Sequence, residues 1–324
     1  MKNIELKPFE EKHIEDAAKL FTERHRAERK HAKLLPPRHE EYHTIAPLLR
    51  DQVKKASGVA IIENGSLSGY LIAQMLQSWR GKRSVFVPFW AHSVAGKNRK
   101  KNYQEMYTYL STQWIANGCF THLISVLAYD REIIDTLFWL GFGMAVIDTM
   151  RDVSDIQDPV ADVEIRLATV NDSDIVVSLD HELAQYLEGP PIFMPMAIKR
   201  GREYHEKWLS KPLHSLWLAS YEGKIVSYMK MCPLDEDHLI TDEKTMWIQG
   251  AYTKEHLRGK GIGSALLKQA LKCAHSQGYE RCAVDFEAEN VLAGAFWLRY
   301  FEPTCFSLVR HINVDIRKGD SPPS

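Results

Sequence analysis

The residues of this sequence best suited to chemistry form a glycine-rich run at 258–264, which reads Arg-Gly-Lys-Gly-Ile-Gly-Ser. Its glycines stand at alternate positions and are Gly259, Gly261 and Gly263. Glycine lets a chain turn tightly and lets a ligand approach backbone N–H groups without meeting a Cβ atom. A periodic apolar stretch predicts a helix from about Ile262, whose unpaired N–H groups and positive dipole end would face the run. With Arg258 and Lys260 nearby, the run predicts an anion site suited to a pyrophosphate.

The spacing of the run excludes two other kinds of glycine loop. A dinucleotide-binding fingerprint would need a glycine where Ser264 stands. A Walker A loop needs four residues between its glycines and then Gly-Lys-Ser or Gly-Lys-Thr, which the run lacks. A turn that binds nothing stays open as an alternative for the run taken alone, because short glycine motifs are common.

A carboxylate stands at the end of the next predicted strand, 282–287. Strand alternation puts Asp285 and Glu287 on one face and Val284 and Phe286 on the other. A half-buried glutamate at the strand end could accept a proton from an ammonium group, directly or through water, so Glu287 is the candidate general base. The alternative is that Glu287 caps the following helix or binds a backbone N–H group.

The elements that must position these residues occur twice in the chain. The residues 138–140, Phe-Trp-Leu, recur at 296–298, and Gly65 and Tyr70 recur as Gly223 and Tyr228 at the same offset of 158. The residues 4–7 also match 163–166, at an offset of 159. Three matching regions in nearly one register indicate an internal repeat. We predict a first copy at 1–151, a linker at 152–162, a second copy at 163–316 and a disordered tail at 317–324.

Each copy shows the same predicted order of a strand, helical sequence, a hairpin, a strand, an amphipathic helix, a strand and a last helix. In the first copy these elements are strand 4–6, hairpin 59–62 and 70–76, strand 85–87, helix 103–114 and strand 123–127. In the second they are strand 163–167, hairpin 216–221 and 224–232, strand 246–248, helix 262–274 and strand 282–287. Gly118 and Gly278 would end the two amphipathic helices. The fold class is α+β, with two tandem domains that each hold a mixed, twisted sheet flanked by helices.

Composition narrows the classes of function. Forty-one basic residues against 42 acidic ones supply no electrostatic drive toward nucleic acid or an anionic membrane. The five cysteines are odd in number and form no CxxC pair, and the histidines show no metal-binding spacing, so no metal is expected. The sequence starts without a signal peptide and holds no apolar run of membrane-spanning length, so we expect a cytoplasmic protein.

The residues 251–263 resemble the signature motif of the GNAT superfamily of N-acetyltransferases, R/Q-x-x-G-x-G/A. The residues 284–287, followed by Asn290, Ala293 and the Phe296-Trp297 pair, resemble that family's fifth strand and the helix after it. The resemblance implies a sheet splayed between its fourth and fifth strands, with the pantetheine arm of acetyl-CoA in the splay.

The resemblance also implies roles for individual residues. Backbone groups of Ala251, Tyr252 and Thr253 would bind the pantetheine, and an N–H group near Tyr252 would stabilise the oxyanion of the reaction. Asn290 would contact the cofactor from the other side, and Trp297 is also expected to bind it. The pyrophosphate would be held by Arg258 and by the residues Gly259, Lys260, Gly261, Ile262, Gly263 and Ser264.

The sequence departs from the family at several positions. Glu255 replaces a frequent proline, and Trp297 replaces a tyrosine that can protonate the departing thiolate; an indole is not an acid at neutral pH. Tyr300, one turn further on, is expected to pack. The general acid is therefore open, and water could serve. The first copy aligns 100–105 with the pyrophosphate loop and lacks its glycines, so it resembles the degenerate half of a tandem GNAT protein.

These observations predict an acyl-CoA-dependent N-acyltransferase. The expected reaction carries acetyl from acetyl-CoA to a primary amine of a small molecule by direct attack. A non-catalytic acyl-CoA-binding or regulatory protein is the alternative from another class, and transfer to an oxygen or to a protein side chain is a lesser one. The loop 186–195, with Glu188, could cover the acceptor or could be a packed crossover. The sequence does not predict the acceptor, the acyl chain length or the oligomeric state.

Overall fold

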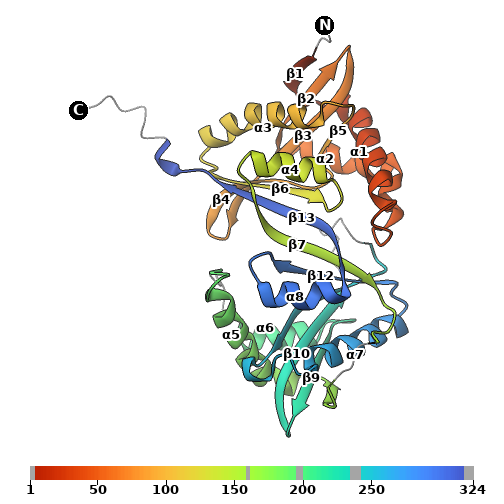
Figure 1. Cartoon of the computed structure of the whole chain (residues 1–324), viewed down its shortest axis with the longest axis vertical. Helices are drawn as coiled ribbons and strands as arrows, with labels where there is room; N and C mark the ends of the chain where they lie inside the picture. The colour runs from red at the N-terminus through yellow and green to blue at the C-terminus, as the bar shows by residue number, and fades with distance from the viewer. Residues whose placement is uncertain (1–3, 158–160, 195–199, 234–241, 317–324) are drawn as a thin grey trace, which may run out of the picture. The chain divides into compact units, whose positions relative to one another are not determined.

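The computed structural model describes residues 4–157, 161–194, 200–233 and 242–316. The chain divides into two compact units (Figure 1). The first unit holds Met1–Ile147 and Thr304–Ser324, and the second holds Asp148–Pro303. The predicted tail and residues 158–160 of the predicted linker lie outside the described residues.

The first unit combines a sheet with four helices in its described part. Its strands are β1 (Ile4–Pro8), β2 (Ser57–Glu63), β3 (Ser66–Trp79), β4 (Lys82–Val87), β5 (His92–Val94) and β6 (Thr121–Leu127). Its helices are α1 (Ile14–Arg29), α2 (Tyr42–Lys55), α3 (Arg99–Ala116) and α4 (Arg131–Trp139). The strand order is β1-β2-β3-β4-β6-β13, in which β13 is the last strand of the chain (Glu302–His311), and β5 pairs with β3 away from this path. The strand β7 (Gly143–Asp152) follows α4 and spans the boundary between the units.

The second unit repeats this arrangement. Its strands are β8 (Glu164–Leu167), β9 (Ser215–Tyr221), β10 (Lys224–Pro233), β11 (Thr245–Thr253) and β12 (Arg281–Glu287), in the order β12-β11-β10-β9-β8. Its helices are α5 (Ser173–Glu188), α6 (Arg202–Leu209), α7 (Ile262–Ser276) and α8 (Val291–Tyr300). The helix α7 packs on β9, β10 and β11, and α5 packs on β10 and β11. Within the described residues, no helix is long and apolar enough to cross a membrane.

The predicted turns are confirmed at their backbone angles. Asn64 and Gly65 have φ of 51° and 85°, which lets the hairpin between β2 and β3 turn in two residues. Glu222 and Gly223 adopt φ of 50° and 74° in the equivalent hairpin between β9 and β10. These left-handed conformations explain why Asn-Gly and Glu-Gly stand between the apolar runs.

The last strand of the chain belongs to the first unit. The strand β13 (Glu302–His311) pairs antiparallel with β6, from Cys305 opposite Leu127 to His311 opposite Thr121. The predicted second copy, 163–316, includes these residues, so the two units are divided here at another place than the sequence predicts. Strand alternation predicts which face of a strand is buried but does not identify its partner strand.

The sheet of the second unit separates where the candidate site lies. The strands β11 and β12 pair in parallel only from Thr245 opposite Arg281 to Ile248 opposite Val284, although both strands continue beyond these residues. On its other side β11 stays paired with β10 as far as Thr253. Among the described residues, no strand therefore pairs with the last residues of β11 on this edge, which confirms the expected splay.

The pairing of β13 with β6 gives a first prediction. Leu308 is fully buried in the first unit, so Leu308→Ala should lower the free energy of unfolding by about 2–5 kcal/mol. Hydrogen exchange should then show faster opening in β6 and its neighbours. Val314→Ala, at an exposed position, is the control. Faster exchange confined to 148–303 would contradict the assignment of β13 to the first unit.

Candidate functional site

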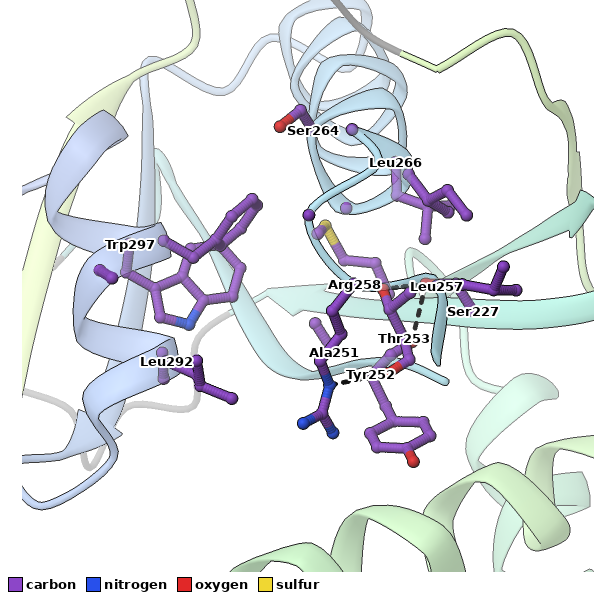
Figure 2. Close-up of a pocket in the computed structure, with 18 of the residues that line it drawn as sticks. Ser227, Ala251, Tyr252, Thr253, Leu257, Arg258, Ser264, Leu266, Leu292 and Trp297 are labelled. Carbon is purple, nitrogen blue, oxygen red and sulfur yellow. Dashed lines mark hydrogen bonds between the residues drawn. The ribbon is translucent and has the colours of Figure 1, made fainter. Parts of the chain in front are cut away.

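A pocket of about 670 Å³ opens along the free edge of β11 in the second unit (Figure 2). One wall is the end of β11, with Ala251, Tyr252 and Thr253. The glycine-rich run and the start of α7 form the second wall. In Figure 2, Leu292 and Trp297 reach from α8 toward this edge and form the third. The pocket thus brings the two sequence motifs together.

The glycine-rich run has the backbone conformation that its composition predicts. Gly259 and Gly261 have φ of 76° and 83°, and Gly261 is the N-cap residue of α7. A Cβ atom built on Gly259 would meet nothing within 4 Å, so this part of the run stands open. A Cβ atom on Gly263 would lie 3.4 Å from the Phe296 ring. Open N–H groups at the start of a helix fit an anionic group such as a pyrophosphate.

The two cations of the run lie over aromatic rings. Arg258 donates from Nε to the Thr253 carbonyl at 3.2 Å, and its guanidinium lies 4.5 Å from the centre of the Tyr186 ring and 5.5 Å from that of Tyr252. The Lys260 ammonium lies 5.4 Å from the centre of the Tyr221 ring. Cation–π contacts orient both side chains.

The Tyr252 side chain turns toward α5. Its hydroxyl donates to Glu182 at 3.3 Å, and Lys254 forms an ion pair with the same carboxylate. Burial, followed by the nearby charge of Glu182, raises the pKa of Tyr252. The Tyr252 carbonyl accepts from the Ser227 hydroxyl at 2.7 Å. The N–H and carbonyl groups of one strand residue point to the same side, so the Tyr252 backbone faces β10, and its neighbours Ala251 and Thr253 present their backbone groups at the free edge.

Asn290 links the pocket to α5. It is the N-cap residue of α8, where its Oδ1 accepts from the Ala293 N–H at 3.1 Å. The same oxygen accepts from the Tyr186 hydroxyl at 2.8 Å. Sequence analysis placed Tyr186 in a loop, whereas it lies in the last turn of α5 and lines the pocket. The helical spacing of Leu179, Leu183 and Tyr186 is the signal that could have shown this.

Among the described residues of the predicted loop 186–195, only Tyr186 lines the pocket. Glu188, the last residue of α5, is exposed, and among the described residues it does not line the pocket. Ile192 is buried and Phe193 is exposed. Pro195 lies outside the described residues.

The two aromatic residues of α8 that concern the missing general acid both line the pocket. Trp297 is buried, and its ring contacts the rings of Phe296 and Phe301. Tyr300, which we expected to pack, places its hydroxyl 2.9 Å from the Ser264 hydroxyl at the start of α7. Tyr300 therefore belongs to the end of the pocket that holds the glycine-rich run.

Glu287 ends β12 as predicted and is half-buried. Val284 and Phe286 are buried on the opposite face, which confirms the alternation. Among the described residues that line the pocket, Glu287 does not appear. Its backbone carbonyl accepts from the Asn290 N–H at 2.9 Å.

The strand β10 also lines the pocket, and a buried polar cluster joins it to α5. Tyr228 lines the pocket and donates to Asp180 of α5 at 2.6 Å. Lys230, two residues along β10, lies 3.4 Å from the same carboxylate. Burial lowers the pKa of Lys230 to about 8, against the opposing effect of Asp180. In the part of the chain that the structure describes, no group of three or more His, Cys, Asp or Glu side chains could hold a metal ion.

The first unit has the same splay but fills it with side chains. The pairing of β4 with β6 ends at Val87 opposite Ile124, and β5 pairs with β3 instead. The buried His92 lies in this opening, with Nε2 at 2.8 Å from the Ser125 carbonyl and Nδ1 at 2.7 Å from the Tyr103 hydroxyl. Burial, followed by the charge of Arg24, holds the pKa of His92 well below its usual value.

The sequence alignment of the first copy needs a correction. The residues 100–105 lie inside the first turns of α3, whereas the loop that precedes this helix is 95–98, with Gly96 as its one glycine. The loop before α3 is shorter than the loop before α7, so a constant offset between the two copies aligns the wrong residues at this place. The absence of the glycine-rich pattern from the first copy still holds.

Comparison with known proteins agrees with this geometry. The residues 183–301 match the model of the family described as Acetyltransferase (GNAT) family. An uncharacterized N-acetyltransferase of Escherichia coli, YjgM, is 29% identical over 79 residues, which are 24% of this chain and 45% of that protein. The chain thus spans less than half the length of this relative.

Two solved structures resemble the whole chain in fold. A GCN5-related N-acetyltransferase from Sphaerobacter thermophilus matches with a TM-score of 0.57 at 14% identity, over 95% of each chain. A tandem GNAT protein from the clavulanic acid biosynthesis pathway matches with a TM-score of 0.50 at 12% identity, over 95% of this chain and 98% of that one.

The family match covers the three walls of the pocket, namely the free edge of β11, the glycine-rich run with the start of α7, and the helix α8. The similarity in fold to the tandem GNAT protein includes the first unit. The residues 183–301 are therefore a domain of the acetyltransferase (GNAT) family.

Proposed function

We propose that the second unit binds acetyl-CoA and transfers its acetyl group to a primary amine of a small molecule. One observation carries this proposal: the free edge of β11 and the open N–H groups before α7 line one pocket. Members of this family use acetyl-CoA as the acyl donor, and the thioester supplies an activated acyl group. An open strand edge next to a glycine-rich helix start suits a long ligand that carries amide groups at one end and a pyrophosphate at the other.

Backbone groups of this chain would do most of the binding. The edge at 251–253 would hydrogen-bond the amide groups of the pantetheine arm, in the manner of an added strand. The N–H groups of 259–264 would bind the pyrophosphate. The N–H group near Tyr252 would stabilise the negative charge that develops on the carbonyl oxygen during acyl transfer.

Direct attack by the amine fits the side chains of the pocket. Among the described residues that line it there is no cysteine. Cys282 lies in β12 next to the splay, and burial raises the pKa of its thiol to about 12, which keeps it protonated. No thiolate is therefore placed in the pocket to form an acyl-cysteine intermediate. The acceptor amine would attack the thioester itself.

Glu287 remains our proposed base. It ends β12 beside the splay and is half-buried, so it could take a proton from the acceptor ammonium through a water molecule. Glu287 does not line the pocket among the described residues, so a proton transfer through water fits this geometry better than a direct transfer from the ammonium group.

Tyr186 is our proposed proton donor to the departing thiolate. The family tyrosine of α8 is replaced by Trp297, whereas the Tyr186 hydroxyl enters the same pocket from α5 and is oriented by Asn290 at 2.8 Å. Arg258 lies over its ring and fixes its plane. Burial raises the pKa of Tyr186, so the phenol stays protonated until it meets a basic thiolate.

A non-catalytic acyl-CoA-binding protein is the second candidate, and Trp297 at the tyrosine position is the observation that favours it. Incubation of the full chain with acetyl-CoA and a panel of small primary amines, with detection of the released thiol, separates the two. We expect amine-dependent thiol release. Tight binding of CoA without thiol release for any amine would favour the second candidate.

The backbone of the glycine-rich run gives a prediction about donor binding. Gly261→Asp places a side chain at φ 83°, which costs about 1–2 kcal/mol, and aims a carboxylate at the pyrophosphate. Calorimetry should show the Kd for CoA rising by at least about tenfold. Gly65→Asp, at φ 85° in the hairpin of the first unit, is the matched control. An unchanged Kd in Gly261→Asp would argue against this binding site.

The proposed base gives a second prediction. Glu287→Gln should reduce the rate of acyl transfer by about a hundredfold, because the ammonium loses its proton acceptor. The Kd for CoA should stay the same, and the pH–rate profile should lose its acidic limb. Glu289→Gln, at an exposed position two residues away, is the control. A profile identical to that of the wild type would leave Glu287 with a structural role.

The proposed proton donor gives a third prediction. Tyr186→Phe should lower kcat by about tenfold to a hundredfold while the KM for acetyl-CoA changes little, since the phenol acts on the leaving group. The thiol of bound CoA should also show a higher pKa, measured by the ultraviolet absorbance of its thiolate. Tyr279→Phe, outside the pocket, is the control. Wild-type kcat and thiol pKa in Tyr186→Phe would exclude this role.

A further inference from the structure

The first unit contains a pocket of its own, of about 320 Å³, which is less than half the volume of the pocket in the second unit. It lies between α1, the end of β5 and the starts of α3 and α4. This is the place that the cofactor pocket takes in the second unit, between α5, β11, α7 and α8. The repeat has therefore kept an opening there while it lost the glycine-rich run.

An ion pair narrows this opening. Arg99, the first residue of α3, pairs with Asp130, the N-cap residue of α4, at 2.5 Å and with Glu132 at 3.1 Å. The Arg99–Asp130 pair and the His92 side chain in the splay occupy the space that corresponds to the pantetheine arm of CoA in the second unit. A long ligand is excluded, whereas a small one still fits the remaining volume.

Arg24 of α1 lines this pocket as a buried charge. Its side chain is only 9% exposed, and its terminal nitrogens donate to neutral acceptors, the carbonyls of Phe89 at 2.7 Å and His92 at 3.0 Å. Its Nε has no hydrogen-bond acceptor, and no carboxylate of the described residues lies within ion-pair distance. Buried guanidinium groups are ordinarily paired with an anion, so this one is suited to an anionic ligand.

Glu28, one helical turn further along α1, lines the same pocket and is 5% exposed. One of its oxygens accepts from the Tyr129 N–H at 3.2 Å. Within the described residues it forms no ion pair, in contrast to Asp130. A buried carboxyl group that faces a pocket in this way is suited to an ammonium ligand.

We infer that the pocket of the first unit binds a small amino carboxylate, such as a free amino acid. The carboxylate of this ligand lies toward Arg24 and its ammonium lies toward Glu28. Side chains four residues apart on a helix have Cβ atoms about 5–6 Å apart, a spacing that one amino carboxylate can bridge. Arg99 and Asp130 neutralise each other. Arg24 and Glu28 are therefore the two opposite charges that recognise the ligand.

The affinity should depend on pH through Glu28. Burial raises the pKa of Glu28 to about 7, against the opposing effect of Arg24 on α1. Arg99 of α3 and Asp130 before α4 also face it, and His31 lies at the rim. Only the ionised carboxylate binds an ammonium group, so affinity should be highest above pH 7 and should fall as the pH drops through that value.

Isothermal titration calorimetry of the full chain with each common amino acid tests this inference, with propionate and propylamine as ligands that carry one charge each. We expect at least one amino acid to bind, and each single-charge ligand to bind at least about tenfold more weakly. Glu28→Gln should weaken binding by at least about tenfold and remove its dependence on pH near 7.

A second variant guards against loss of folding. Ala27 lines the pocket at an exposed helix position, so Ala27→Trp should fill the pocket and abolish binding without lowering Tm. Asp135→Asn changes an exposed carboxylate of α4 that does not line the pocket, and it should leave the Kd unchanged. Failure of every amino acid to bind the wild-type chain would overturn the inference. So would binding that survives both Glu28→Gln and Ala27→Trp, because the ligand would then sit elsewhere.

Discussion

The separation of two parallel strands is the constraint on which the site depends. Pairing between β11 and β12 ends at Ile248 opposite Val284, so the following residues of β11 lose one set of backbone partners. Buried backbone groups need hydrogen bonds, and a ligand with amide groups can supply them. The helix α7 begins beside this edge, and its N-cap glycine leaves N–H groups open. The splay and the helix start together define a ligand that is extended at one end and anionic at the other.

The two units show how one arrangement can lead to two kinds of pocket. In the second, glycines keep the start of α7 open and the pocket stays large. In the first, the imidazole of His92 occupies the splay and the Arg99–Asp130 pair crosses its mouth. The same opening persists as a smaller pocket with two buried charges, Arg24 and Glu28. Loss of the glycine-rich run therefore changed the chemistry of the opening without closing it.

Sequence reasoning predicted the features that local physics controls. The hairpins at Asn64-Gly65 and Glu222-Gly223, the helix start at Ile262 and the alternation along β12 follow from backbone freedom and periodicity. The partner of β13 could not be predicted, because pairing depends on distant segments. The hydrogen bond between Tyr186 and Asn290 joins residues 104 positions apart and was missed for the same reason. Glu287 was placed correctly at the strand end, but alternation alone could not show that the pocket wall excludes it.

The central claim is that the donor lies along the free edge of β11 in the second unit. Amide hydrogen exchange of the full chain, measured with and without CoA, tests it most directly. The account predicts slower exchange at the amides of Ala251 and Thr253 and across 259–264, with no change at 94–99 in the first unit. Protection confined to the first unit, or none at 251–253 when CoA is saturating, would contradict it.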